Sequence, residues 1–378
     1  MPETSPSAEE RRPPPGMIRI GRIAGSPVLV SSSWFLVAAL IAYLMAPRVD
    51  QVQPGLGGWK YAVGIAFAIA LYGAILLHEA SHAIAARHYG LQVDSITLHF
   101  LGGATAIVGE VRRPRHEFWI AVVGPITSIA VGAAALLVWL VTPDGISRLV
   151  VEGLAGANLV IGVMNLVPGL PLDGGRVLKA GIWAATGRDT TGTTVAGWTG
   201  RLLAVALAAW ALIGHDSDAP TRTLVLGLVA LFLWFGASQA IASSRLVRRF
   251  DGLRAGDLAR RTLTVPEDLP LAEAIRRSQE DGARSIVTTT SDGRPAGVVD
   301  TRALAATPEE RWPWVAVSTV ARSLAGGLTL PAAISGPDLL RALREQPASQ
   351  YLLVAPDGSV AGVLAASDIA REIRRRPR

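Results

Sequence analysis

Long apolar runs, separated by short polar segments, dominate the first two thirds of the chain. They cover residues 28–46, 61–86, 117–142, 149–167, 200–214 and 222–242. Because a spanning helix needs about 20 mostly apolar residues, this pattern predicts a polytopic α-helical membrane protein with about six transmembrane helices. The fifth run is short and begins beside Arg201, whereas the fourth ends at Pro168.

After Phe250 the pattern changes to a charged sequence with alternating strand-like segments. Two stretches are copies of one another, each reading as a helix, a strand, an Asp-Gly turn and a strand. They comprise residues 270–277, 285–288 and 292–299 in the first copy, and residues 338–344, 351–354 and 357–364 in the second. We therefore predict a C-terminal α/β domain over 251–378, with repeats at about 251–308 and 312–378.

The N-terminal segment differs from both regions. Residues 1–16 carry several charges and three consecutive prolines, Pro13 to Pro15, so we interpret them as a disordered tail. The predicted domains are thus 1–16 (tail), 17–250 (membrane) and 251–378 (α/β).

Composition agrees with a membrane protein and limits its chemistry. Hydrophobic residues make up 50% of the chain and charged residues 17%, below the roughly 25% of soluble domains. The mean hydropathy is +0.37. With no cysteine, any metal site must use His, Asp or Glu. The net charge of +6 would suit nucleic acid, but the arginines gather at the ends of apolar runs, so we expect a lipid bilayer and no nucleic acid as partner.

The arginine distribution also predicts the topology. The runs are flanked on one side by Arg11, Arg12, Arg19, Arg22, Arg87, Arg112, Arg113, Arg115, Arg245, Arg248 and Arg249. The opposite loops, around Asp50, Asp144 and Asp216, carry fewer positive charges. Because cytoplasmic loops are enriched in Lys and Arg, both termini are predicted to be cytoplasmic.

The second apolar run ends in His78-Glu79-Ala80-Ser81-His82. Two histidines four residues apart lie on one face of a helix, which is the spacing that binds one zinc ion, and Glu79 is placed to accept a proton from the attacking water. Ionisable groups cost about 2.5–3.5 kcal/mol each near the bilayer centre. Their presence here therefore indicates function.

A catalytic zinc site usually has three protein ligands, and several residues compete for the third position. His88 would lie about 9 Å further along a continuous helix and roughly 240° around from His82, so we exclude it. Glu110 and Glu117 are acidic, but they lie beside the arginine cluster and read more simply as interfacial charges. Asp173 follows a Pro- and Gly-rich break in the fourth run, a feature tolerated in a membrane only inside protein or beside a water-filled cavity.

These motifs together resemble a known family. An HExxH helix in the membrane, followed two helices later by Asn165-x-x-Pro168-x-x-Pro171-Leu172-Asp173-Gly174, is similar to the site-2 protease family of intramembrane zinc metalloproteases (peptidase M50-like). The Gly124-Pro125 pair in the third helix also matches. The repeated α/β segment resembles a tandem CBS domain, so the chain is similar to the branch with C-terminal CBS domains.

The resemblance implies roles for individual residues. His78, His82 and Asp173 would be zinc ligands, Glu79 the general base, and Asn165 a group that steadies substrate or the developing oxyanion. Residues 96–108, which include Leu101 and Gly102 to Ala104, resemble a membrane-associated β-hairpin that presents an edge to an unfolded substrate strand. The implied substrate is a single-pass membrane protein such as an anti-sigma factor, cleaved in a bacterial cell membrane by regulated intramembrane proteolysis.

The CBS pair leaves two interpretations open. Such modules often bind adenosyl compounds, with an aspartate on the ribose, and Asp368 lies six residues past Gly362, where that aspartate is expected. The equivalent position in the first repeat is Ala303. The pair therefore either senses an adenosyl nucleotide at one site, modulating the protease, or is a degenerate module that serves homodimerisation.

Two rival functions use the same features. A transporter or channel with a regulatory CBS pair would explain the broken fourth helix, but not the zinc spacing of the histidines. A catalytically inactive membrane scaffold would not need His78, Glu79, His82 and Asp173 all intact.

Overall fold

The structure is a computed structural model that describes residues 14–100, 102–109, 111–213, 220–324 and 328–375. The chain divides into two compact units, residues 1–242 and residues 243–378. The predicted boundary at residue 250 lies at the end of α7 (Pro220–Phe250), whereas the two units divide between residues 242 and 243, within that helix.

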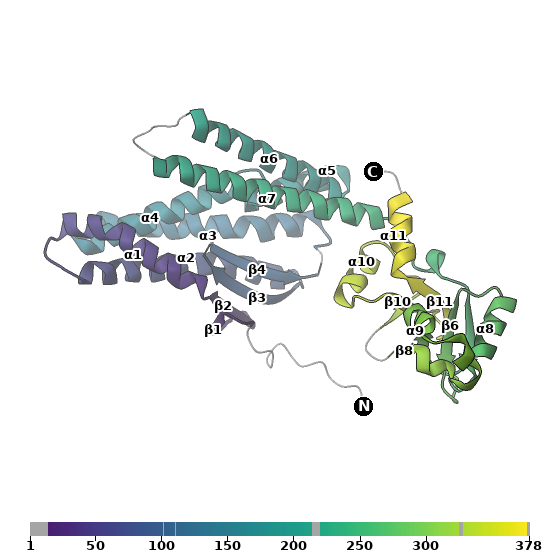
Figure 1. The fold of residues 1–378 in the computed structure, drawn as a ribbon. Coiled ribbons are helices and arrows are strands. Elements are labelled where there is room, and N and C mark those ends of the chain that lie inside the picture. The colour runs from purple at the N-terminus through teal and green to yellow at the C-terminus, as the bar shows by residue number, and fades with distance from the viewer. Residues whose placement is uncertain (1–13, 101, 110, 214–219, 325–327, 376–378) are drawn as a thin grey trace. The chain divides into compact units, whose positions relative to one another are not determined.

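The first unit is built mainly from long helices (Figure 1). They are α1 (Ser33–Val52), α2 (Trp59–His88), α3 (Pro114–Val141), α4 (Ile146–Asn165), the shorter α5 (Asp173–Thr186), α6 (Asp189–Ile213) and α7 (Pro220–Phe250), which continues into the second unit. Six of these helices, all except α5, are long and apolar enough to cross a membrane. Many of their large apolar side chains are exposed, as lipid contact requires. The prediction of six spans is confirmed.

A four-stranded sheet lies beside α2, and both β3 and β4 contact that helix (Figure 1). Its strands are β1 (Met17–Ile23), β2 (Ser26–Ser31), β3 (Gln92–His99) and β4 (Gly102–Val108), in the order β1-β2-β3-β4. The predicted hairpin corresponds to β3 and β4, which pair antiparallel with Ile96 opposite Thr105. Leu101 lies outside the described residues.

The beginning of the chain corrects the sequence analysis. Residues 28–31 were predicted to start the first helix, but they belong to strand β2, which pairs antiparallel with β1 and parallel with β3. A short apolar run with β-branched Val28 and Val30 suits a buried strand equally well, and periodicity alone does not separate the two. The first helix begins at Ser33.

The fifth span also differs from its prediction. Helix α6 begins at Asp189 rather than near residue 200, so Arg201 lies well inside it. The guanidinium of Arg201 donates to Ser238 Oγ of α7 at 3.0 Å and lies over the rings of Trp198 and Trp234. These contacts between α6 and α7 make an arginine tolerable inside an apolar helix.

The predicted break after the fourth helix is present. Helix α4 ends at Asn165 and α5 begins at Asp173. The backbone of the loop between them is hydrogen-bonded within the protein: Leu170 N–H donates to Ala196 O at 3.1 Å, and Leu172 N–H to Gly169 O at 3.0 Å. Helix α5 itself was not predicted. It contacts α3 and α6, and so fixes its first residue inside the helical unit.

The second unit contains the two predicted repeats. The first consists of β5 (Thr262–Pro266), α8 (Leu271–Glu280), β6 (Ser285–Thr289), β7 (Pro295–Val299), α9 (Thr301–Ala306) and β8 (Ala321–Ser323). The second consists of β9 (Thr329–Pro331), α10 (Gly336–Glu345), β10 (Gln350–Val354), β11 (Val360–Ala365) and α11 (Ala366–Arg375). Short 3₁₀ helices lie at Gly256–Leu258, Glu309–Trp314 and Val317–Val320. In both repeats the predicted helix and two strands are present, and the strands turn at Gly293 and Gly358 with positive φ.

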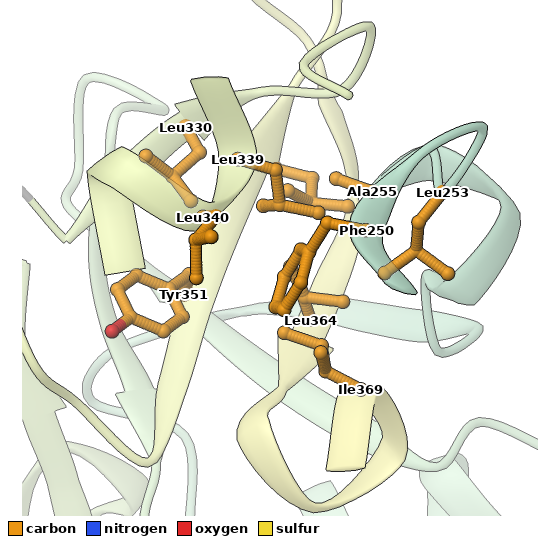
Figure 2. Packing of buried hydrophobic residues seen from close by; sticks show 10 residues of the cluster. Phe250, Leu253, Ala255, Leu330, Leu339, Leu340, Tyr351, Leu364 and Ile369 are labelled. Atoms are coloured by element: carbon orange, nitrogen blue, oxygen red, sulfur yellow. The ribbon is translucent and has the colours of Figure 1, made fainter. Parts of the chain in front are cut away.

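Each repeat has its own core. The first is centred on Leu271, Ile286 and Val317. The second contains Leu339, Tyr351 and Leu364, and Figure 2 shows Phe250 and Leu253 packed into it. Because Phe250 is the last residue of α7, the C-terminal end of that helix is part of the core of the second repeat.

Candidate metal centre

Helix α2 places the predicted motif on one buried face. His78, Glu79 and His82 are all less than 10% exposed. The helix is continuous to His88, so the i, i+4 spacing brings the two imidazole Nε2 atoms to 3.2 Å of each other.

Asp173 reaches the same point from the start of α5. Its Oδ2 lies 3.2 Å from Nε2 of His78 and 3.2 Å from Nε2 of His82. Within the described residues these three form the group of His, Asp or Glu side chains that could hold a metal ion. A tetrahedral zinc with bonds of about 2.0–2.2 Å needs ligand atoms about 3.3–3.6 Å apart. The donor set and its separations therefore fit zinc, and the triangle leaves one coordination position open.

The other nitrogen of each imidazole is also bound. Nδ1 of His78 lies 2.9 Å from Ser128 Oγ, and Nδ1 of His82 lies 2.5 Å from Ile120 O, both in α3. Since a backbone carbonyl only accepts, Nδ1 of His82 must carry the proton, which leaves Nε2 free to bind a metal. Helix α3 thus orients both rings.

Gly124 allows α3 to approach the centre this closely. A Cβ at this position would overlap Nε2 of His82 and lie 2.7 Å from Nε2 of His78. Any larger residue would therefore occupy the space of the ligand atoms themselves. The sequence analysis noted the Gly124-Pro125 pair only as a point of resemblance, and the structure supplies its physical reason.

Strand β4 packs against α2 at Glu79. The Thr105 hydroxyl donates to Glu79 Oε2 at 2.6 Å and also lies 3.1 Å from Glu79 O. A Cβ on Gly103 would overlap the Glu79 side chain. The sequence analysis did not single out Thr105. Burial in β4 alternates, with Thr105 and Ile107 more buried than Ala104, Ala106 and Val108, but this alternation is visible only in the structure.

His88 and Glu117, which were rejected as the third ligand, lie outside the group of His78, His82 and Asp173. His88 is exposed at the end of α2. Glu110 lies outside the described residues. Glu117 is buried rather than exposed, and its Oε1 accepts from Arg176 Nε at 3.0 Å. Arg176, one turn after Asp173, is thus the partner of Glu117 and links α5 to α3.

Asn165 is half-buried and is the last residue of α4. It precedes the loop that leads to Asp173, so it lies at the break where the resemblance puts a substrate-binding residue. Its role as a group that contacts substrate remains a prediction.

In the second unit, Asp368 is held by an arginine. Its Oδ2 lies 2.6 Å from Arg260 Nε, and its Oδ1 lies 3.2 Å from Arg371 Nη1. The hydrogen bond from Arg260 holds the pKa of the Asp368 carboxyl below its usual range. Ala303, the equivalent position in the first repeat, lies in α9. The role of Asp368 in nucleotide binding also remains a prediction.

A membrane-embedded His-His-Asp centre with an adjacent glutamate, joined to paired CBS-like repeats, defines a membrane metalloprotease class. Comparison with known proteins gives the family. The family model for Peptidase family M50 matches residues 66–150 and 145–208, and the CBS domain model matches residues 255–308. The chain belongs to peptidase family M50, the site-2 protease family of zinc metalloproteases.

Individual relatives match over nearly the whole chain. Two proteins named "Putative zinc metalloprotease" are similar: one from Mycobacterium tuberculosis is 30% identical over 94% of this chain and 92% of its own length, and one from Synechocystis sp. is 28% identical over 94% of both. A solved structure, the site-2 protease from Methanocaldococcus jannaschii, is 26% identical, with a TM-score of 0.42 over 60% of this chain and 95% of that chain.

Proposed function

We propose that this protein is an intramembrane zinc metalloprotease that hydrolyses a peptide bond within or near the transmembrane segment of a single-pass membrane protein. The observation that carries the proposal is the 3.2 Å triangle of His78 Nε2, His82 Nε2 and Asp173 Oδ2 with Glu79 beside it, inside a unit with six candidate spans. A transporter would need no such set of ligands with an adjacent carboxylate.

Each residue of the centre has a separate role in the proposed hydrolysis. Zinc, when bound by His78, His82 and Asp173, supplies Lewis acidity to the scissile carbonyl and to the attacking water. Glu79 accepts the proton of that water and later passes it to the leaving amine. Asn165 donates a hydrogen bond to the developing oxyanion, a type of contact typically worth about 2.7–4 kcal/mol.

The substrate enters as an extended strand. A helical substrate hides its carbonyls in its own hydrogen bonds, so it must unwind before attack. Among the described residues, strand β4 pairs with β3 alone and so forms an edge of the sheet, and Gly103 of this strand lies against Glu79. A substrate strand added to that edge would pass the general base.

Metal content tests the site without any substrate. We expect about one zinc per chain in detergent-purified protein by inductively coupled plasma mass spectrometry, which also distinguishes zinc from iron or cobalt. Asp173→Ala should lose most of it. The matched control is Asp144→Ala, because Asp144 is an exposed aspartate paired only with Arg148 among the described residues. Unchanged zinc in Asp173→Ala would contradict the three-ligand site.

Proteolysis is tested by co-reconstituting the full chain in liposomes with a panel of tagged single-pass membrane proteins, anti-sigma factors included. Mass spectrometry of the products should find cuts inside or next to an apolar segment. Glu79→Gln should abolish cleavage and keep zinc, whereas Glu152→Gln, at an exposed position of α4, should not affect either. Cleavage by Glu79→Gln at the wild-type rate would exclude Glu79 as the base.

We further propose that the CBS pair modulates cleavage, that both termini are cytoplasmic, and that the membrane is the bacterial cell membrane. Modulation is supported by α7, one continuous helix whose last residues, Leu246, Val247 and Phe250, pack in the core of the second repeat. The topology is supported by the arginines at the ends of the apolar runs. An adenosyl ligand bound at Asp368 would have to share this carboxylate with Arg260 or displace Arg260 from it.

The modulation has a direct test in the full chain. Isothermal titration with ATP, AMP and S-adenosylmethionine should give heat with one of them, and that ligand should change the cleavage rate. No heat with any of the three would favour the alternative role in homodimerisation, which light scattering of the detergent complex would show.

A further inference from the structure

We propose that Thr105 is the positioning residue of the general base: its hydroxyl fixes the rotamer of Glu79 so that the carboxylate faces the metal centre. The inference rests on the proposed function, because it assumes that Glu79 is the base. It concerns the orientation of Glu79 and therefore a residue on the strand, not on the helix that carries the zinc motif.

The Thr105 hydroxyl contacts Glu79 directly. Thr105 Oγ1 lies 2.6 Å from Glu79 Oε2 and 3.1 Å from Glu79 O, so one hydroxyl contacts both ends of the same residue. The short distance is typical of a hydrogen bond to a charged acceptor. In the described part of the chain, no other side chain donates to this carboxylate.

A glutamate side chain needs such a constraint to act as a base. It has three rotatable bonds, and fixing them costs free energy. A base must stay within hydrogen-bond reach of the proton that it abstracts. Gly103 leaves room for the side chain on one side, because a Cβ there would overlap it. Gly103 thus leaves space for the Glu79 side chain, and Thr105 sets the orientation of its carboxylate.

The position of Thr105 on β4 is itself fixed by the sheet. On β4, Gly103 and the side chain of Thr105 lie against Glu79 of α2, whereas the side chains of Ala104 and Ala106 are exposed. Thr105 is therefore held by the register of β4 against β3, opposite Ile96, which is fully buried. The orientation of the base thus depends on the same strand whose free edge would receive the substrate.

Three variants separate positioning from a structural role. Thr105→Val keeps the branched shape and removes the hydroxyl, and Thr105→Ser keeps the hydroxyl. The matched control is Thr97→Val, because Thr97 pairs with Ala104 on the other face of the sheet. All three should retain zinc and the wild-type Tm to within a few degrees.

Kinetics give the first readout, with the substrate cleaved fastest in the reconstituted panel. Losing a hydrogen bond to a charged group should lower kcat about 10- to 100-fold in Thr105→Val, with KM unchanged because substrate binding does not use the hydroxyl. Thr105→Ser should recover most of the rate, and Thr97→Val should match wild type. Equal kcat in Thr105→Val and wild type, or an equal loss in Thr105→Ser, would overturn the proposal.

Infrared spectroscopy gives a second readout that needs no turnover. The difference spectrum between wild type and Glu79→Gln isolates the carboxylate band of Glu79. The same difference taken in the Thr105→Val background should show that band shifted, and an unshifted band would overturn the proposal. If wild type cleaves nothing in the panel, the proposed proteolysis fails, while the band shift still tests the contact between Thr105 and Glu79.

Discussion

At the scale of single residues, Gly124 gives the sharpest test of the metal centre. A methyl group at this position would overlap Nε2 of His82 and crowd Nε2 of His78. We therefore expect Gly124→Ala to push the rings apart and lower zinc affinity at least about 10- to 100-fold, the range seen when the groups supporting a ligand are disturbed. Zinc retention against chelators of graded affinity would measure the change.

The control for this substitution lies on the helix that carries the ligands. Gly73 is in α2, and a Cβ there would meet no other atom within 4 Å. Gly73→Ala should therefore retain zinc, and its helix should be slightly more stable. Normal affinity in Gly124→Ala would mean that α3 does not approach the imidazoles as closely as described.

The residues of the centre differ in how far the sequence could predict them. His78, Glu79 and His82 are recognised by local spacing, and Asp173 by the helix break before it. Thr105 and Ser128 bind Glu79 and His78 across 26 and 50 residues of sequence. No local pattern marks such contacts, since they depend on how a strand and a second helix pack on α2.

At the scale of elements, one buried ion pair joins α3 to α5. Glu117 is 3% exposed and accepts from Arg176. Glu117→Gln would leave Arg176 without its charged partner and with Lys179 nearby. We expect a loss of roughly 3 kcal/mol in stability, at the lower end for a broken buried pair because Arg176 is partly exposed. The Tm in detergent should fall accordingly.

A double variant identifies the cause. Adding Arg176→Gln to Glu117→Gln removes the unpaired charge, so part of the Tm should return, and the two effects should not be additive. Asp144→Asn removes the exposed pair with Arg148 and should change the Tm little. Simple additivity of the two inner substitutions would show that Glu117 and Arg176 act independently.

The elements themselves were predicted unevenly, for physical reasons. Length and hydropathy identify a span that carries few charges, as in α2 and α3. They placed the start of α6 too late, because Arg201 lies inside this helix, where Trp198, Trp234 and Ser238 stabilise it in the folded protein. They also failed at β2 and α5, which are too short for hydropathy to separate a strand from a helix or a half-helix from a loop.

At the scale of the whole chain, the change of pattern after residue 250 predicted both units, and the repeated Asp-Gly turns predicted the paired architecture. The sequence pattern did not show which repeat packs against the end of α7. That depends on the core, where Phe250 and Leu253 pack with Leu339 and Tyr351 of the second repeat. The segment that enters this unit therefore packs against the second repeat, although the first repeat follows it directly in the sequence.

The ion pair of Arg260 and Asp368 also joins the beginning of the first repeat to the end of the second, since the two residues are 108 positions apart in the sequence. Arg260 also donates its backbone N–H to Val363 O at 2.9 Å. The pKa of Asp368 is lowered, chiefly by the hydrogen bond from Arg260. Because its folded pKa lies below the unfolded value of about 3.9, the pair stabilises the unit fully above about pH 5. That contribution is lost as the pH falls through 4 towards the folded pKa.

Calorimetry of the full chain between pH 3 and 7 would test this dependence. Leu339→Ala, which should cost about 2–5 kcal/mol in the core, identifies the transition of the second unit. The Tm difference between wild type and Asp368→Asn should be constant from pH 5 to 7 and should shrink below pH 4. Asp338→Asn, which removes an exposed pair with Arg341, should show no such change. A Tm difference that persists to pH 3 would mean that Asp368 stabilises the unit without its charge, and the pair with Arg260 would then not be what closes the two repeats.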